Sequence, residues 1–233
     1  MATIGQMLVS TAMGLGMLVA TGCSGTQIPL QPAGGIVQNY PTRTPVVNTV
    51  SLSTQAAGAP AQTKQVDVYA DGTVALTGLP WFNQGNDRTC AQANIASIMN
   101  YWGISTTYPK VVAEMNPMNL PTDVINVTTY LRQKGLNAQD YREATINYLK
   151  QQINEGKPTL VLLDFGDLSS EHYVTVKGYN DTTGKILYND PVEGPNMLLD
   201  YDTFQQLWGN AALKAIPTFG DKYTRIAFDV SVK

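Results

Sequence analysis

The clearest periodic pattern of apolar residues lies in the middle of the chain, over residues 91–102. Its apolar positions have the spacing of one face of an α-helix: Ile95, Ile98, Met99 and Trp102. We therefore expect a helix here with one buried face and with Cys90 in its first turn.

Start and stop signals predict four shorter helices after this one, over residues 109–114, 123–134, 146–155 and 204–208. Pro109 suits the first turn of a helix, and Thr122 and Thr145 suit the N-cap position. Gly135 and Gly156 stand where the second and third of these helices should end. The first half of the domain is therefore expected to be helical.

Strand patterns flank this helical region. Apolar and polar residues alternate over 66–76 around Asp71-Gly72, which predicts a hairpin with a two-residue turn. After residue 158 the chain consists of short runs rich in Val, Leu and Tyr, over residues 159–165, 172–179, 185–189, 213–216 and 224–232. Helices followed by an antiparallel sheet describe an α+β domain.

The N-terminal region has the pattern of an export signal. The first charged residue is Arg43, and residues 7–20 are apolar but too few to span a bilayer. Small residues then lead into Cys23, as in the lipobox of bacterial lipoproteins. We expect residues 1–22 to be a signal peptide and Cys23 to carry lipid, which places the protein on the bacterial cell envelope. Ser24 would direct it to the outer membrane of a Gram-negative cell. The alternatives are an ordinary secretory signal cut near Cys23 or a simple buried segment.

The composition of the chain distinguishes an N-terminal tether from a folded domain. Residues 24–63 are mostly Thr, Gln, Pro, Ala, Gly, Val and Ser, so we expect a flexible tether over 23–64 and one folded domain over 65–233. The whole chain has 15 basic and 18 acidic residues and a net charge of −3. This balance gives no electrostatic footprint for nucleic acid, while peptide and protein substrates remain open.

The cysteines point to a reactive thiol. The chain has two, so lipidation of Cys23 would leave Cys90 as the only free thiol and no disulfide inside the chain. The start of a helix stabilises a thiolate, which is the nucleophilic form of cysteine. A buried structural cysteine is the alternative interpretation.

Three further residues fit chemistry at Cys90. His172 is the single histidine of the chain, so it is the only imidazole that can act as a general base. Asp190 follows the next predicted strand and precedes a proline, where its carboxylate can accept the second ring N–H of a histidine. Gln84 lies six residues before the cysteine, where its amide can point at a developing oxyanion. One histidine and one remaining cysteine make no usual zinc site, and no cofactor motif is present.

These residues carry a family resemblance. Gln84, Cys90 at a helix start, a His-Tyr-Val strand at His172 and Asn-Asp-Pro around Asp190 together resemble the papain-like cysteine peptidases that process bacteriocin leaders, in their stand-alone form. The resemblance implies a papain-like fold, with Cys90 as nucleophile, His172 as base, Asp190 as the residue that orients the histidine, and Gln84 as oxyanion donor. Many members have Asp-Cys-Gly where this chain has Thr89-Cys-Ala.

The expected function is an envelope-tethered thiol hydrolase. It would cleave a peptide or amide bond of a peptide or protein substrate through a thioester acyl-enzyme, with the membrane contacted through the lipid. Two alternatives remain. The same site could pass the acyl group to an amine, or the chain could be a binding or assembly lipoprotein that keeps the fold without catalysis.

Overall fold

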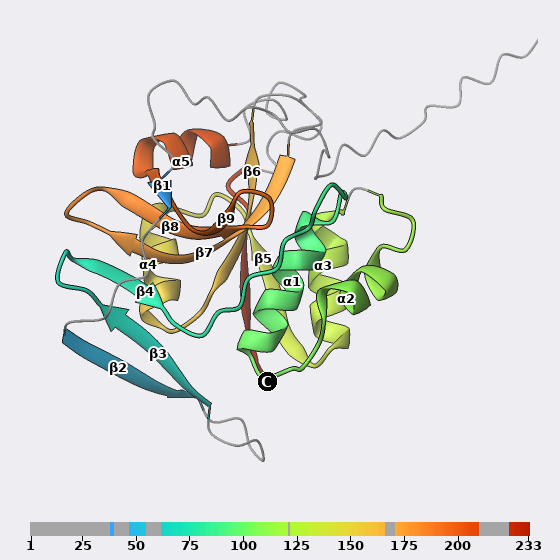
Figure 1. Cartoon of the computed structure of the whole chain (residues 1–233), viewed down its shortest axis with the longest axis horizontal. Helices are drawn as coiled ribbons and strands as arrows, with labels where there is room; N and C mark the ends of the chain where they lie inside the picture. The colour runs from blue at the N-terminus through green and yellow to red at the C-terminus, as the bar shows by residue number, and fades with distance from the viewer. Residues whose placement is uncertain (1–37, 40–46, 55–61, 121, 166–170, 210–223) are drawn as a thin grey trace, which may run out of the picture.

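The computed structural model describes residues 38–39, 47–54, 62–120, 122–165, 171–209 and 224–233 (Figure 1). The predicted signal peptide, Cys23 and the predicted strand 213–216 lie outside these residues. Helices α1, α2 and α3 lie together on one side of a twisted sheet, and α4 and α5 lie against its other parts (Figure 1). Within the described ranges, no helix has the length and apolar character needed to cross a membrane.

The sheet is antiparallel and has ten strands in the described residues. They are β1 (Gln38–Asn39), β2 (Val47–Thr54), β3 (Gln62–Val68), β4 (Thr73–Leu76), β5 (Leu136–Tyr141), β6 (Thr159–Asp164), β7 (Glu171–Asn180), β8 (Lys185–Asp190), β9 (Gly194–Asp200) and β10 (Ala227–Val232). The main order is β1-β9-β8-β7-β4-β3-β2. The sheet branches at β7, because β6 also pairs with β7 and carries β10, which in turn pairs with β5.

Strand β7 is the centre of the sheet. Its first half pairs with β6, from Glu171 opposite Asp164 to Val176 opposite Thr159. Its second half pairs with β8 on the opposite edge and with β4 where β6 has ended. The pairing with β8 begins only at Thr175, so the residues before it have no described strand on that edge. A side chain near the start of β7 can therefore reach past the end of β8.

The helices agree with the sequence predictions to within two residues at either end, apart from the start of the last one. They are α1 (Cys90–Tyr101), α2 (Tyr108–Met115), α3 (Val124–Gln133), α4 (Ile146–Asn154) and α5 (Tyr201–Trp208), which begins three residues earlier than expected. Thr145 caps α4 as predicted, because its hydroxyl accepts from the Tyr148 N–H. Thr122 does not cap α3. Asp123 holds that position, and the Thr122 hydroxyl instead accepts from the Gln92 side chain at 2.8 Å.

Helix α1 is buried almost all round rather than on one face as predicted. Its polar side chains are buried because they bond to the surrounding elements. Asn94 donates from Nδ2 to the carbonyl oxygens of Cys90 and Tyr173, both at 2.8 Å, and its Oδ1 accepts from Thr175 Oγ1 at 2.6 Å. These bonds fix the first turn of α1 against β7.

Several strands differ from the sequence predictions. β5 and β9 lie in stretches for which no strand was predicted, and β1 and β2 lie in the stretch expected to be a tether without fold. β2 pairs with β3 from Val47 opposite Val68 to Thr54 opposite Gln62. The expectation of no secondary structure over 24–63 is therefore wrong for these strands. β1 and β2 are polar strands that are stabilised by pairing with neighbouring strands. The composition of a segment does not predict such pairing.

The hairpin around Asp71-Gly72 is confirmed, but its turn is longer than predicted. Tyr69 N donates to Thr73 O at 2.8 Å, so three residues form the loop instead of two. Gly72 N donates to Tyr69 O at 2.9 Å, and Gly72 has a φ of +84°. This is a type I turn followed by a left-handed glycine, a usual three-residue hairpin connection.

Candidate active site

Cys90 lies at the start of α1 and is completely buried. Its Sγ accepts a hydrogen bond from the backbone N–H of Tyr173 at 3.4 Å. Tyr173 is in the first half of β7, directly after His172. The fold therefore brings the cysteine beside the histidine, although 81 residues separate them along the chain.

His172 and Asp190 are in direct contact. His172 Nε2 lies 2.8 Å from Asp190 Oδ1. The contact forms because the β7–β8 pairing stops short of His172, so the imidazole reaches Asp190 at the end of β8. With Nε2 bound to the carboxylate, Nδ1 is the ring nitrogen that remains for Cys90.

Asp190 is a buried carboxylate held by several donors. Its Oδ1 also accepts from the backbone N–H groups of Val192 at 2.8 Å and Glu193 at 3.2 Å. Burial by itself raises the pKa of Asp190. The charge and hydrogen bond of His172, together with the two N–H groups, outweigh burial, so the pKa lies below its ordinary value. Asp190 is therefore ionised at neutral pH.

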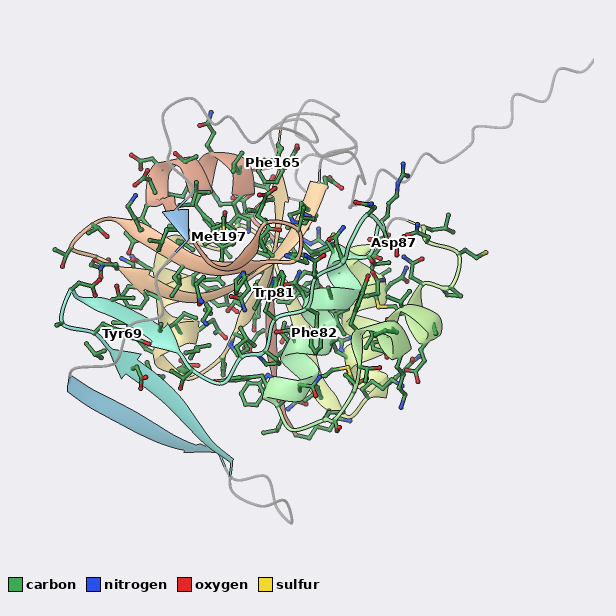
Figure 2. The ribbon with its side chains drawn as sticks, viewed as in Figure 1. Tyr69, Trp81, Phe82, Asp87, Phe165 and Met197 are labelled. Atoms are coloured by element: carbon green, nitrogen blue, oxygen red, sulfur yellow. The ribbon has the colours of Figure 1, made fainter. Side chains whose placement is uncertain are left out.

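The segment leading into α1 packs on the turn that follows β8. Trp81 Nε1 donates to Asp190 O at 2.7 Å, and Gln84 N donates to Pro191 O at 2.9 Å. Figure 2 labels Trp81, Phe82 and Asp87 along this segment, which runs in front of the sheet toward α1. Sequence reasoning missed Trp81, since an indole that bonds to a main-chain oxygen 109 residues away leaves no local pattern.

The Gln84 side-chain amide is bound within the loop that precedes α1. Nε2 donates to Asp87 O at 2.6 Å, which leaves one N–H of the amide for another acceptor. Oε1 is buried and has no hydrogen-bond partner among the described residues. An unpaired buried polar atom costs about 1–3 kcal/mol, and such atoms are rare enough to need a functional or structural reason.

Cys90 is not a free thiol in the structure, which contradicts the prediction. It is disulfide-bonded, and no described cysteine is free. The only other cysteine of the sequence, Cys23, lies outside the described residues. The prediction excluded a disulfide by assuming that Cys23 was already lipidated. A disulfide removes the nucleophile, so catalysis at Cys90 requires the reduced sulfur.

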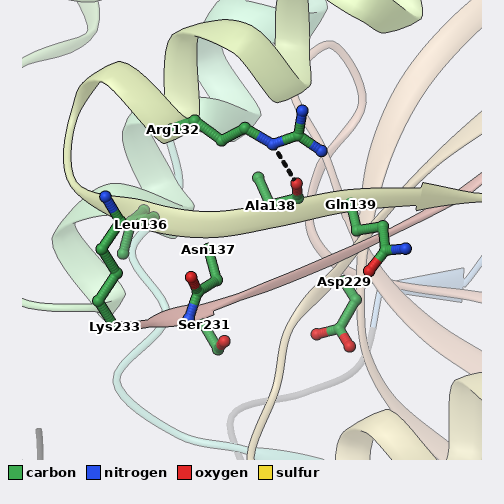
Figure 3. A pocket seen from close by; sticks show the side chains of 8 residues that line it. All are labelled: Arg132, Leu136, Asn137, Ala138, Gln139, Asp229, Ser231 and Lys233. Atoms are coloured by element: carbon green, nitrogen blue, oxygen red, sulfur yellow. Dashed lines mark hydrogen bonds between the residues drawn. The ribbon is translucent and has the colours of Figure 1, made fainter.

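A surface cavity lies apart from the predicted site residues. A cavity of about 560 Å³ lies between the end of α3 and strands β5 and β10 (Figure 3). Its lining is Arg132, Leu136, Asn137, Ala138, Gln139, Asp229, Ser231 and Lys233. Arg132 Nε donates to Ala138 O at 2.7 Å across it. None of the four predicted site residues lines this cavity. In the part of the chain that the structure describes, no group of three His, Cys, Asp or Glu side chains is placed to hold a metal ion.

The arrangement of helices and sheet defines the class of protein. A buried helix begins at a cysteine and packs on an antiparallel sheet that carries a histidine and an acidic residue, and this is the fold of papain-like cysteine peptidases. The Peptidase_C39 like family matches residues 76–216, which is more than half of the chain. The protein belongs to this family and is a cysteine peptidase by its fold.

Two solved structures with a TM-score above 0.5 agree on the fold, and a third structure is similar to the chain at a lower score. A putative C39-like peptidase from Bacillus anthracis is 15% identical, with a TM-score of 0.52 over 69% of this chain and 98% of that one. The peptidase domain of Streptococcus ComA, a bi-functional ABC transporter involved in a quorum sensing pathway, is 16% identical, with a TM-score of 0.51 over 66% and 99%. A double glycine motif protease from an AMS/PCAT transporter, in complex with the leader peptide, is 18% identical, with a TM-score of 0.47 over 66% and 91%. No curated protein matches the chain.

Proposed function

We propose that this protein is an envelope-tethered thiol hydrolase that cleaves a peptide or amide bond with Cys90, His172 and Asp190. The observation that carries the proposal is the part-buried His172–Asp190 contact of 2.8 Å, directly beside the backbone N–H that binds Cys90 Sγ. A nucleophile, a base and a carboxylate that orients the base are the three parts that acyl transfer by a thiol requires.

The reaction would begin with the reduced cysteine. His172 Nδ1 takes the thiol proton, and the thiolate attacks the carbonyl carbon of the substrate, whose π electrons move to the oxygen. The negative oxygen is stabilised by the N-terminal end of α1 and by the amide of Gln84. When the carbonyl reforms, the C–N bond breaks and His172 gives its proton to the leaving amine. Water, activated by His172, then attacks the thioester and releases the acid and the thiol.

Asp190 supports both halves of this cycle. Its carboxylate accepts from Nε2, which holds the ring with Nδ1 available to the sulfur and stabilises the imidazolium that forms. Because the pKa of Asp190 is lowered, the carboxylate stays charged while the histidine gains and loses its proton.

Thiol labelling of the reduced protein tests the proposal. Cys90 should react with iodoacetamide at mildly acidic pH much faster than an ordinary thiol, because an ion pair with His172 and the start of α1 keep the sulfur as a thiolate. The measurement is the alkylation rate of Cys90 by mass mapping, after reduction and removal of the reductant.

The control is the other cysteine of the same chain. In protein that has not been processed or lipidated, Cys23 should react at the rate of an ordinary thiol. Equal rates at Cys90 and Cys23 would refute the thiolate. If Cys90 is a thiolate but the protein hydrolyses neither 4-nitrophenyl acetate nor peptides, acyl transfer to an amine or a binding role replaces hydrolysis.

The envelope anchor is a separate part of the proposal and is supported by the sequence alone. Small residues before Cys23 and the short apolar run 7–20 fit a lipoprotein signal. We expect the mature protein to begin at Cys23, to carry acyl chains and to partition into a detergent phase. Intact-mass measurement of protein purified from membranes checks this, and Cys23→Ser should abolish the added mass. A mature N-terminus elsewhere without lipid would remove the tether from the proposal.

A further inference from the structure

One side chain outside the proposed triad links the two segments that form the oxyanion side of the site. Tyr108, near the start of α2, has its hydroxyl 2.5 Å from Thr89 Oγ1 and donates to Gln84 O at 3.1 Å. Thr89 directly precedes Cys90, and Gln84 is the proposed oxyanion donor. The phenol therefore joins α2 to both ends of the loop that leads into α1.

The direction of these hydrogen bonds follows from the number of protons. A phenol has one proton, and Tyr108 gives it to the Gln84 carbonyl. The Thr89 hydroxyl must then donate its own proton to the Tyr108 oxygen. Burial raises the pKa of Tyr108, the Thr89 hydrogen bond opposes this, and the negative charge of Asp87 adds to it. Tyr108 therefore keeps its proton throughout the neutral range.

The bond to Tyr108 changes what Thr89 does for α1. Thr89 is the N-cap residue of this helix, yet its side chain makes no capping hydrogen bond. Thr107 and Thr145 stand at the same position of α2 and α4, and both accept from a backbone N–H of their helix. A threonine cap on α1 would bind a first-turn N–H beside Cys90, the place where an oxyanion has to be stabilised.

The Tyr108 hydroxyl also fixes the backbone of Gln84. The Gln84 N–H is bound to Pro191 O at 2.9 Å, and the Gln84 carbonyl is bound to Tyr108. The main chain is thus held from both sides, by the Asp190 turn and by α2. The direction of the Gln84 side chain, with its unpaired Oε1, depends on this backbone.

We propose that Tyr108 is a positioning residue that holds Thr89 and Gln84 so that the start of α1 stays open to the substrate oxyanion. This inference rests on the proposed function, since it concerns the same site. The Tyr108 hydroxyl then helps to stabilise the transition state. It contributes neither to forming the thiolate nor to binding the ground-state substrate.

The change Tyr108→Phe tests it, because the ring stays and the hydroxyl is lost. We expect kcat for 4-nitrophenyl acetate to fall about tenfold, the effect of one lost hydrogen bond on transition-state stabilisation, with KM nearly unchanged. The alkylation rate of reduced Cys90 should stay at the wild-type value. Tyr130→Phe is the matched control, since that hydroxyl bonds to Glu114 Oε2 at 2.7 Å and to none of the proposed site residues, so the change should leave kcat unaltered.

A second substitution separates positioning from general destabilisation. In Tyr108→Phe the Thr89 hydroxyl is released and can cap α1, so adding Thr89→Val should restore part of the lost kcat. A double variant no better than Tyr108→Phe overturns the inference, and so does an equal fall in the alkylation rate. The proposed function is judged on the wild type alone: if it neither hydrolyses the ester nor alkylates quickly, that function fails. An active wild type with an equally active Tyr108→Phe overturns only the role of Tyr108.

Discussion

His172→Ala should abolish turnover and, in the same variant, raise the pKa of the reduced Cys90 thiol toward about 8.5. Both losses are expected together because one ring is the proton carrier and the counter-ion of the thiolate. The chain has no other histidine, so no second imidazole can replace it. The measurements are kcat/KM for 4-nitrophenyl acetate and the rate of Cys90 alkylation as a function of pH.

The direction of the pH change follows from the ion pair. In the wild type the thiolate persists at mildly acidic pH, so alkylation stays fast there. In His172→Ala the thiol is protonated below about pH 8.5, so alkylation falls over the whole neutral range. An alkylation profile identical to that of the wild type would show that Cys90 and His172 are not a pair, and the catalytic proposal would be abandoned.

Two changes at Asp190 are the controls for this experiment. The Asp190 Oδ1 accepts from His172 Nε2 and from the N–H groups of Val192 and Glu193. An asparagine oxygen can accept the same three bonds, so Asp190→Asn should retain appreciable activity. Asp190→Ala should lose much more, because the ring can rotate away from the sulfur. Equal losses in both variants would mean that the charge of Asp190, and not its orienting bond, is what matters.

Gln84→Ala should lower kcat by about 10²–10³, the usual effect of losing one oxyanion donor, with little change in the alkylation rate of Cys90. The alkylating reagent builds up no oxyanion, so the two measurements separate transition-state stabilisation from thiol activation. In the structure Nε2 is bound to Asp87 O, and the second N–H of that amide is the one available to substrate.

The matched control is Gln151→Ala, since Gln151 is an exposed glutamine of α4 whose amide bonds to Glu155. It should leave both measurements unchanged. Loss of alkylation in Gln84→Ala would instead show that this residue shapes the cysteine's surroundings, as its bond to Pro191 O also allows. The oxyanion role would then pass to the start of α1 alone.

The sequence by itself determined the elements whose causes are local. Helix α1 and its start at Cys90 follow from apolar spacing, and α4 follows from a threonine cap that the structure contains. Because the chain has a single histidine, its composition alone restricted the choice of an imidazole base to one residue. Local patterns named Asp190 and Gln84 as candidates, and the resemblance to leader-processing peptidases gave the correct fold.

Tertiary structure decided the features that depend on contacts between distant segments. His172 reaches Asp190 because the pairing of β7 with β8 begins at Thr175, a register that no single segment encodes. Strands β2 and β5 form on partner strands despite polar sequences, and α1 is buried on almost every side because β7 and its neighbours supply partners for its polar groups. The hydrogen bond that the Thr89 hydroxyl donates to Tyr108 is also of this kind. This hydrogen bond exists only once α1 and α2 have packed, so the local sequence around Thr89 does not predict it.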